Sequence, residues 1–136
     1  SYKNFEDILN YQNAKLKYDQ NQFNNNTLVA FKGPEFHKLN KALQQQILNS
    51  ELKVSKYNNR MAYQLEPLFK NNLEQILTAP VLPGTVQLTP SGQLIVLMKD
   101  CQTTGGYPRV LQLTEYSINI LSQKKPGNYL EISLKE

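Results

Sequence analysis

The feature of this sequence that most constrains its fold is a series of short apolar runs separated by proline, glycine and asparagine. Gly33-Pro34, Asn58-Asn59 and Pro126-Gly127 each lie beside such a run. Proline withholds a backbone donor and glycine permits turn conformations, so these residues are typical of strand ends. We therefore predict short strands at residues 28–31, 51–55, 61–65, 86–88, 94–98, 109–114 and 129–134.

Helical periodicity is confined to a few stretches. Apolar residues between Phe36 and Leu48 recur at spacings of three and four, which predicts one helix with a single buried face. Residues 117–121 fit a second, short helix, and residues 68–77 fit either a short helix or a loop packed on the core. Many short strands with one or two short helices predict a mainly β barrel or sandwich.

The domain organisation follows from the length and from the composition of the N-terminal segment. A chain of 136 residues suits one domain with a single modest core. Residues 1–26 are rich in amide side chains and lack a sustained apolar period, so we interpret them as a linker or an ordered arm. Residues 27–136 then form the domain itself.

Composition excludes several classes of function. The net charge of +4 comes mainly from scattered lysines, without the basic block that follows a nucleic-acid backbone. One histidine, His37, and one cysteine, Cys101, are too few for a zinc or haem site within the chain, and no motif links them as a catalytic pair. No apolar run reaches the roughly 18 residues of a membrane span, and a single cysteine fits a reducing, cytoplasmic compartment. We expect no metal, nucleic-acid or membrane partner.

The segment 99–109 concentrates side chains suited to ligand recognition in a loop after a buried strand. Consecutive glycines can adopt positive φ and turn backbone N–H groups toward an anion, while hydroxyl and amide groups can donate to a carboxylate or phosphate. The alternative is an ordinary connecting turn whose threonines satisfy their own backbone, and composition does not decide between the two. The candidate binding residues are Gln102, Thr103, Thr104, Gly105, Gly106 and Tyr107.

The chain uses lysine for most of its positive charge and has only two arginines, Arg60 and Arg109. A planar guanidinium can grip a carboxylate with two hydrogen bonds, so we predict that Arg60 or Arg109 contacts the anionic part of a ligand. Pairing with a surface acid is the alternative for each. Asp100 ends the buried strand and can accept a hydrogen bond or a proton from a substrate, with pairing to Lys99 or Arg109 as its alternative.

Four segments carry a specific pattern in a fixed order: residues 59–65, 83–88, 90–97 and 100–108. The most specific is the run Gln-Thr-Thr-Gly-Gly-Tyr-Pro at residues 102–108. Together these segments resemble the biotin-dependent carboxyltransferase family. That family includes the C-subunit of the bacterial ATP-dependent 5-oxoprolinase (formerly allophanate hydrolase subunit 2), the antagonist of the sporulation kinase inhibitor, and the matching part of urea carboxylase. The resemblance spans residues 28–134 and corresponds to the C-terminal half of a family member.

The resemblance implies a cyclophilin-like β-barrel and an active site shared with a companion subunit or domain. In 5-oxoprolinase, subunits A and B are the companions, and the assembly hydrolyses ATP to open the lactam ring of 5-oxoproline. In urea carboxylase, the same fold transfers a carboxyl group from carboxybiotin to urea. The resemblance therefore implies ATP bound by the assembled complex or carboxybiotin carried on another domain, and it implies that the isolated chain is inactive.

The resemblance also transfers roles to particular residues. Asn59 and Arg60 match the family's Asn/Asp-Arg-Met segment, and residues 100–108 match its glycine-bearing loop, which implies a pocket for a small amide or lactam. Ala62 and Gln64 depart from the glycine and arginine that are frequent at those positions. The leading interpretation is an enzyme-subunit domain with Asp100 as its catalytic candidate. The alternative is a non-catalytic regulatory module that sequesters a partner such as a kinase-inhibitor-like subunit.

Overall fold

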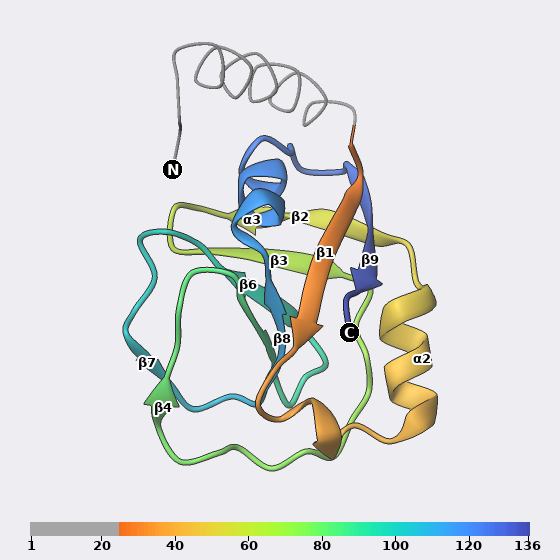
Figure 1. Cartoon of the computed structure of the whole chain (residues 1–136), viewed down its shortest axis with the longest axis vertical. Helices are drawn as coiled ribbons and strands as arrows, with labels where there is room; N and C mark the ends of the chain where they lie inside the picture. The colour runs from red at the N-terminus through yellow and green to blue at the C-terminus, as the bar shows by residue number, and fades with distance from the viewer. Residues whose placement is uncertain (1–24) are drawn as a thin grey trace, which may run out of the picture.

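The strands of the computed structural model, which describes residues 25–136, close into a barrel (Figure 1). The order around the barrel is β1-β8-β5-β6-β3-β2-β9, with β1 and β9 parallel and the other neighbours antiparallel. The barrel strands are β1 (Thr27–Lys32), β2 (Leu52–Asn58), β3 (Ala62–Glu66), β5 (Thr85–Leu88), β6 (Leu94–Leu97), β8 (Arg109–Leu113) and β9 (Tyr129–Leu134). Two short strands, β4 (Ala79–Pro80) and β7 (Thr104–Gly105), form a separate two-stranded sheet.

The barrel core consists mainly of aliphatic side chains; buried and exposed positions alternate in β9, whereas β5 is buried at all four positions. In β9, Leu130 and Ile132 are buried between exposed neighbours, and Leu130 lies opposite the buried Leu52 of β2. In β6, Leu94, Val96 and Leu97 are all buried, as the unbroken apolar run predicts. Each buried side chain of this size contributes about 1.5–3 kcal/mol relative to an exposed one, so this interior is the main stabilising element.

The helix predicted over 36–48 is wrong in one respect, because the structure divides it in two. A 3₁₀ turn, η1 (Phe36–Lys38), is followed by α2 (Lys41–Asn49). The Asn40 side chain accepts a hydrogen bond from the backbone N–H of Leu43 at 2.8 Å, which caps a new helix at this point. The predicted apolar face is nevertheless buried on both sides of the break, since Phe36, Leu43 and Ile47 are all buried.

Among residues 25–136, helix α3 (Glu115–Ser122) is the third helical element, and it confirms the short helix predicted at 117–121. Thr114 caps its N-terminus by accepting from the backbone N–H of Ser117. The Ser117 hydroxyl accepts from the backbone N–H of Val29 at 2.7 Å, which attaches α3 to β1. Helix α3 packs mainly against β1 and β8, and its last residue contacts Tyr63 of β3, so the helix also forms one wall of the candidate site.

The described residues confirm the mainly β architecture and settle the choice between barrel and sandwich in favour of a closed barrel. All seven predicted strands are present within one or two residues of their expected ends, apart from β2, which extends to Asn58. Residues 68–77 contain no helix or strand, so the loop interpretation of this segment is correct. The predicted arm covers residues 1–26, and its first 24 residues lie outside the described part of the chain.

Candidate functional site

The turn between β2 and β3 presents Arg60 at the end of the barrel. The Asn59 side-chain oxygen accepts from the backbone N–H groups of Met61 at 2.8 Å and Ala62 at 3.1 Å. The backbone N–H of Asn59 donates to the carbonyl of Ala62 at 3.0 Å, which closes the turn. Asn59 therefore fixes the turn backbone, and the exposed Arg60 lies at its tip.

The loop that follows β6 brings Asp100 beside this turn. The backbone N–H of Met98 donates to the carbonyl of Met61 at 2.9 Å, and that of Asp100 donates to the carbonyl of Arg60 at 3.3 Å. These bonds continue the antiparallel pairing of β3 with β6 beyond the end of the strand. Two residues that lie far apart in sequence are thereby held at one end of the barrel.

Helix α3 supplies the third side of the same region. Its last residue, Ser122, accepts a hydrogen bond through its backbone carbonyl from the Tyr63 hydroxyl at 3.3 Å. Ile118, one turn earlier in the helix, is buried beneath the surface. Tyr63 comes from β3, so the helix and the sheet meet across this side chain.

These three segments line a cavity of about 580 Å³ that opens to solvent, and this volume is within the size range of small-molecule sites. Its floor is apolar, because it is formed by the side chains of Met98 and Ile118, which are both largely buried. Its rim carries the exposed charges of Arg60, Lys99 and Asp100. The complete lining is Asn59, Arg60, Tyr63, Met98, Lys99, Asp100, Ile118 and Ser122.

The electrostatics of the cavity leave its charged groups available to a ligand. Among residues 25–136, neither Arg60 nor Asp100 has an ion-pair partner within 4 Å. Burial raises the pKa of the Tyr63 phenol above its ordinary value, so this group is a protonated, neutral donor throughout the physiological range. The cavity thus combines a guanidinium, an ammonium, a carboxylate and a phenol above an apolar floor.

The glycine-bearing loop does not share this cavity. Residues 102–107 extend away from it and pair with the segment before β5: the backbone N–H of Val81 donates to the carbonyl of Thr103 at 3.1 Å and that of Ile76 donates to the carbonyl of Gly106 at 2.9 Å. The expectation of positive φ at Gly105 and Gly106 is wrong, because the described glycines with positive φ are Gly84, Gly92 and Gly127.

Packing explains one of the two glycines in this loop. A Cβ on Gly105 would lie 2.5 Å from Nε2 of the buried Gln87, whereas a Cβ on Gly106 would meet nothing closer than the carbonyl oxygen of Ile76 at 3.6 Å. Of the predicted binding residues, Asn59, Arg60 and Asp100 line the cavity together. The structure separates from them Gln102, Thr103, Thr104, Gly105, Gly106, Tyr107 and Arg109.

The Arg109 guanidinium, which we expected to reach a ligand, is bound within the chain. Its Nε and Nη2 donate to the two carboxylate oxygens of Glu35 at 2.8 and 2.9 Å, and its Nη1 donates to the carbonyl of Pro80 at 2.9 Å. Glu35 is only 6% exposed. Arg109 thereby connects the start of η1 to the β4–β7 sheet, which is a structural role.

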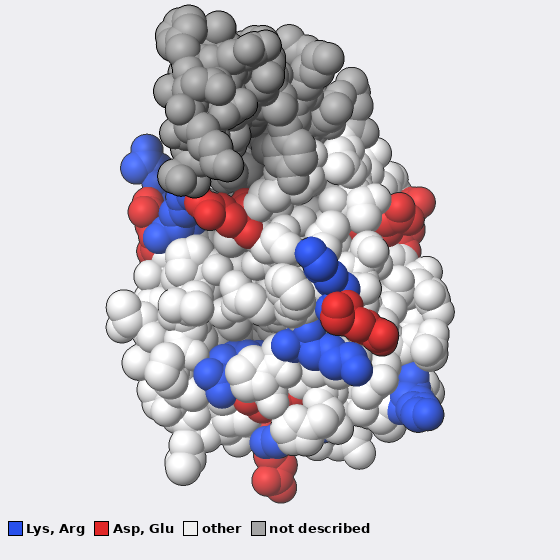
Figure 2. Space-filling view, viewed as in Figure 1, with Lys and Arg blue, Asp and Glu red and all other residues white. Residues whose placement is uncertain are grey.

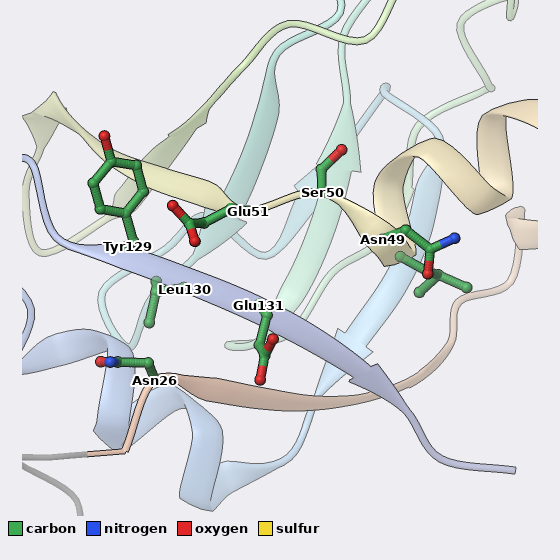
Figure 3. A pocket seen from close by; sticks show the side chains of 8 residues that line it. Asn26, Asn49, Ser50, Glu51, Tyr129, Leu130 and Glu131 are labelled. Carbon is green, nitrogen blue, oxygen red and sulfur yellow. The ribbon is translucent and has the colours of Figure 1, made fainter.

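Two other hollows among the described residues contain none of the predicted site residues, and the first of them is also poorly suited to an anionic ligand. One, of about 530 Å³, is lined by Glu51 and Glu131, and Figure 3 shows these carboxylates with Tyr129 around the β9 strand. Two carboxylates repel a further anion. The other, of about 380 Å³, lies between α2 and residues 70–73 and is lined mainly by amide and lysine side chains.

The remaining candidate chemistry is limited among the described residues. No group of three or more His, Cys, Asp or Glu side chains in residues 25–136 is arranged to hold a metal ion. Burial raises the pKa of the Cys101 thiol, and the charge of Asp100 adds to this, so the thiolate is disfavoured. No helix in the same part of the chain has the length and apolar character needed to cross a membrane. On the face shown in Figure 2, acidic and basic side chains are interspersed over a largely uncharged surface.

Sequence reasoning missed part of the cavity wall, namely Tyr63, Met98, Lys99, Ile118 and Ser122. Tyr63 and Met98 carry a usable signal, because each lies within three residues of Arg60 or Asp100 on a predicted strand. Ile118 and Ser122 carry none, since their contribution depends on how α3 packs against the barrel.

Comparison with known proteins gives a consistent family match. The chain matches the model described as carboxyltransferase domain, subdomain A and B, over residues 4–133. It is 38% identical over 116 residues to the Escherichia coli (strain K12) protein named as the C-subunit of 5-oxoprolinase, and 34% identical over 93 residues to the Haemophilus influenzae protein of that name. These matches cover 82% and 64% of this chain but 37% and 30% of the relatives. The chain spans about a third of the length of these curated relatives.

Solved structures show the same fold at lower identity. Urea amidolyase of K. lactis superposes with a TM-score of 0.71 at 16% identity, over 78% of this chain and 7% of that one. Kluyveromyces lactis urea carboxylase gives a TM-score of 0.68 at 17% identity, over 78% of this chain and 10% of the other. Identities this low support the fold alone.

Proposed function

The chain belongs to the carboxyltransferase domain family, subdomain A and B, and from that membership we propose that it is part of a protein of the 5-oxoprolinase C-subunit type. In this proposal, the cavity between the β2–β3 turn, the loop after β6 and α3 binds a small amide or lactam substrate. The observation that carries the proposal is the guanidinium of Arg60, which pairs with no acid among residues 25–136 and lies above the apolar floor formed by Met98 and Ile118.

Each group in the cavity has a role in the proposed binding mode. Arg60 and Lys99 hold an anionic group of the substrate, since both are cations at the exposed rim. The apolar floor receives the carbon skeleton of the substrate. Asp100 is the catalytic candidate, because a carboxylate at this position can accept a proton or hydrogen bond from the amide N–H.

Companion subunits complete the proposed site. Arg60, Lys99 and Asp100 are all exposed, so the cavity is open on the side that these residues line. We place ATP hydrolysis, and carboxybiotin if it is used, on the companions, because this chain has neither a Gly-Lys-Ser/Thr phosphate loop nor a biotin-bearing lysine motif. The assembly would act in the bacterial cytoplasm.

The test uses the full-length subunit co-expressed with its companion subunits. The assay measures ATP-dependent loss of 5-oxoproline by the wild type and by Arg60→Gln and Arg60→Lys. Loss of a hydrogen-bonded charge should raise the KM of Arg60→Gln by about 10- to 100-fold, with Arg60→Lys intermediate because it keeps the charge but not the planar fork. Lys70→Gln is the matched control, since it removes one positive charge from a different hollow.

Two outcomes would contradict this function. Unchanged kinetics in Arg60→Gln would show that this cavity does not bind the substrate. Absence of turnover by the wild-type assembly, combined with tight binding of a companion, would favour the alternative of a non-catalytic regulatory module.

A further inference from the structure

The Tyr63 hydroxyl is a neutral donor at the wall of the cavity, where the sheet meets α3. Its present acceptor is the backbone carbonyl of Ser122 at 3.3 Å, which is longer than the 2.5–3.0 Å typical of hydroxyl hydrogen bonds. A bond of that length is weak, so a ligand oxygen in the cavity can replace it. The ring itself is half-buried and packs against the core, which fixes the hydroxyl at the cavity wall.

The chemistry of the lining divides the cavity into two kinds of polar contact. Arg60 and Lys99 are cations and match a carboxylate. Tyr63 is an uncharged donor, because a phenol is protonated at neutral pH and burial raises its pKa further, so it matches an uncharged carbonyl oxygen. Met98 and Ile118 form an apolar surface in the same cavity, which suits a hydrocarbon ring or chain.

We propose that Tyr63 is a specificity-determining residue of this site, where its hydroxyl donates to the carbonyl oxygen of a small cyclic amide whose carboxylate is held by Arg60. This inference rests on the proposed function and deepens it, because it assigns the two ends of the substrate to two different side chains. The hydroxyl exchanges the carbonyl of Ser122 for the carbonyl of the ligand, so the phenol keeps an acceptor when the ligand binds.

The experiment uses two ligands that each keep one end of the substrate, 2-pyrrolidinone and cyclopentanecarboxylate. Their inhibition constants are measured against 5-oxoproline turnover in the assembled complex for the wild type, Tyr63→Phe and Arg60→Gln. We expect Tyr63→Phe to weaken 2-pyrrolidinone by about 3- to 10-fold, the value of one neutral hydrogen bond, and to leave cyclopentanecarboxylate unchanged. Arg60→Gln should show the reverse pattern.

The control and the outcomes keep the two proposals separate. Tyr57→Phe makes the same chemical change on β2, at a ring that is 63% exposed and does not line the cavity, and it should alter neither inhibitor. A thermal melt within the range of the wild type checks that Tyr63→Phe is folded. If Arg60→Gln weakens cyclopentanecarboxylate while Tyr63→Phe leaves both 2-pyrrolidinone inhibition and the substrate KM unchanged, only the role of Tyr63 is overturned. If Arg60→Gln also changes nothing, the proposed function fails with it.

Discussion

Replacing Arg109 with methionine tests the structural role that the geometry gives to this residue. Arg109→Met removes both side-chain hydrogen bonds to the Glu35 carboxylate and the bond to the carbonyl of Pro80. Glu35 would keep one partner, the backbone N–H at position 109, at 3.1 Å. The Glu35 side chain, which is only 9% exposed, would then carry a carboxylate without its ion-pair partner.

The size of the effect follows from the burial of the two partners. Removing one member of a buried ion pair costs about 3–5 kcal/mol, and we expect the lower end, about 3 kcal/mol, because the Arg109 side chain is 19% exposed. Glu35→Gln should cost less, about 1–2 kcal/mol, because the amide oxygen can still accept from the backbone and the guanidinium can reach water. The double variant should therefore lose less than the sum of the two, with a coupling of about 1–2 kcal/mol.

The pH dependence of this coupling has a definite sign. Burial alone would raise the pKa of Glu35, but the hydrogen bonds and charge of Arg109 outweigh it and hold the pKa below the ordinary value of 4.5. A carboxyl group with a lowered folded-state pKa contributes stability above its unfolded pKa, and loses it as the pH falls through the folded value. The coupling should be complete at pH 7 and shrink below pH 4.5.

Urea unfolding followed by far-UV circular dichroism measures these differences, since the chain contains no tryptophan. The matched control is Lys53→Met, which breaks the pair between Lys53 and Glu66 at 3.7 Å, where both side chains are over 40% exposed. That change should stay within about 0.5 kcal/mol. A loss in Arg109→Met no larger than in Lys53→Met, or a coupling indistinguishable from zero at pH 7, would refute the structural role.

Two further predictions concern the loop glycines and the start of α2. Gly105→Ala should lower stability by about 1 kcal/mol, because the new Cβ must displace the side chain of Gln87, which is 2% exposed, whereas Gly106→Ala should be close to neutral. Equal urea midpoints for the two variants would contradict the packing explanation. Asn40→Ala should cost about 1 kcal/mol through loss of the cap on α2, and Asn40→Ser should recover most of it; no loss in the alanine variant would mean that the helix begins elsewhere.

The strands were predictable because their apolar pattern reflects a purely local requirement. A strand with one buried face must alternate, as Leu130 and Ile132 do, and turn residues mark where it ends. The division of the helix at Asn40 was less predictable. Asparagine occurs both inside helices and at their N-termini, and the apolar period of Phe36, Leu43 and Ile47 continues across the break.

The candidate site was predictable only where its residues lie on neighbouring segments of one sheet. Arg60 and Asp100 flank strands that pair with each other, so a hairpin turn and the adjacent loop meet at the same end of the barrel. Ile118 and Ser122 belong to a helix that packs across that end, and such a contact depends on tertiary packing. Arg109 shows the converse, because a guanidinium fit for a ligand carboxylate fits an internal carboxylate equally well.

The Gly105-Gly106 pair shows that a sequence motif can indicate the family of a chain without indicating the structural role of its residues. Two adjacent glycines are compatible with an anion-binding loop and with close packing, and the two explanations differ in backbone conformation. Positive φ at these positions would favour an anion-binding nest, but the structure instead places Gly105 in β7, against the amide of Gln87. The residues of the motif at 102–108 therefore have a structural role, because they form β7 and pair with the segment that contains β4. In the proposed function, the anionic group of the substrate binds at Arg60, whose guanidinium has no acidic partner within 4 Å among the described residues.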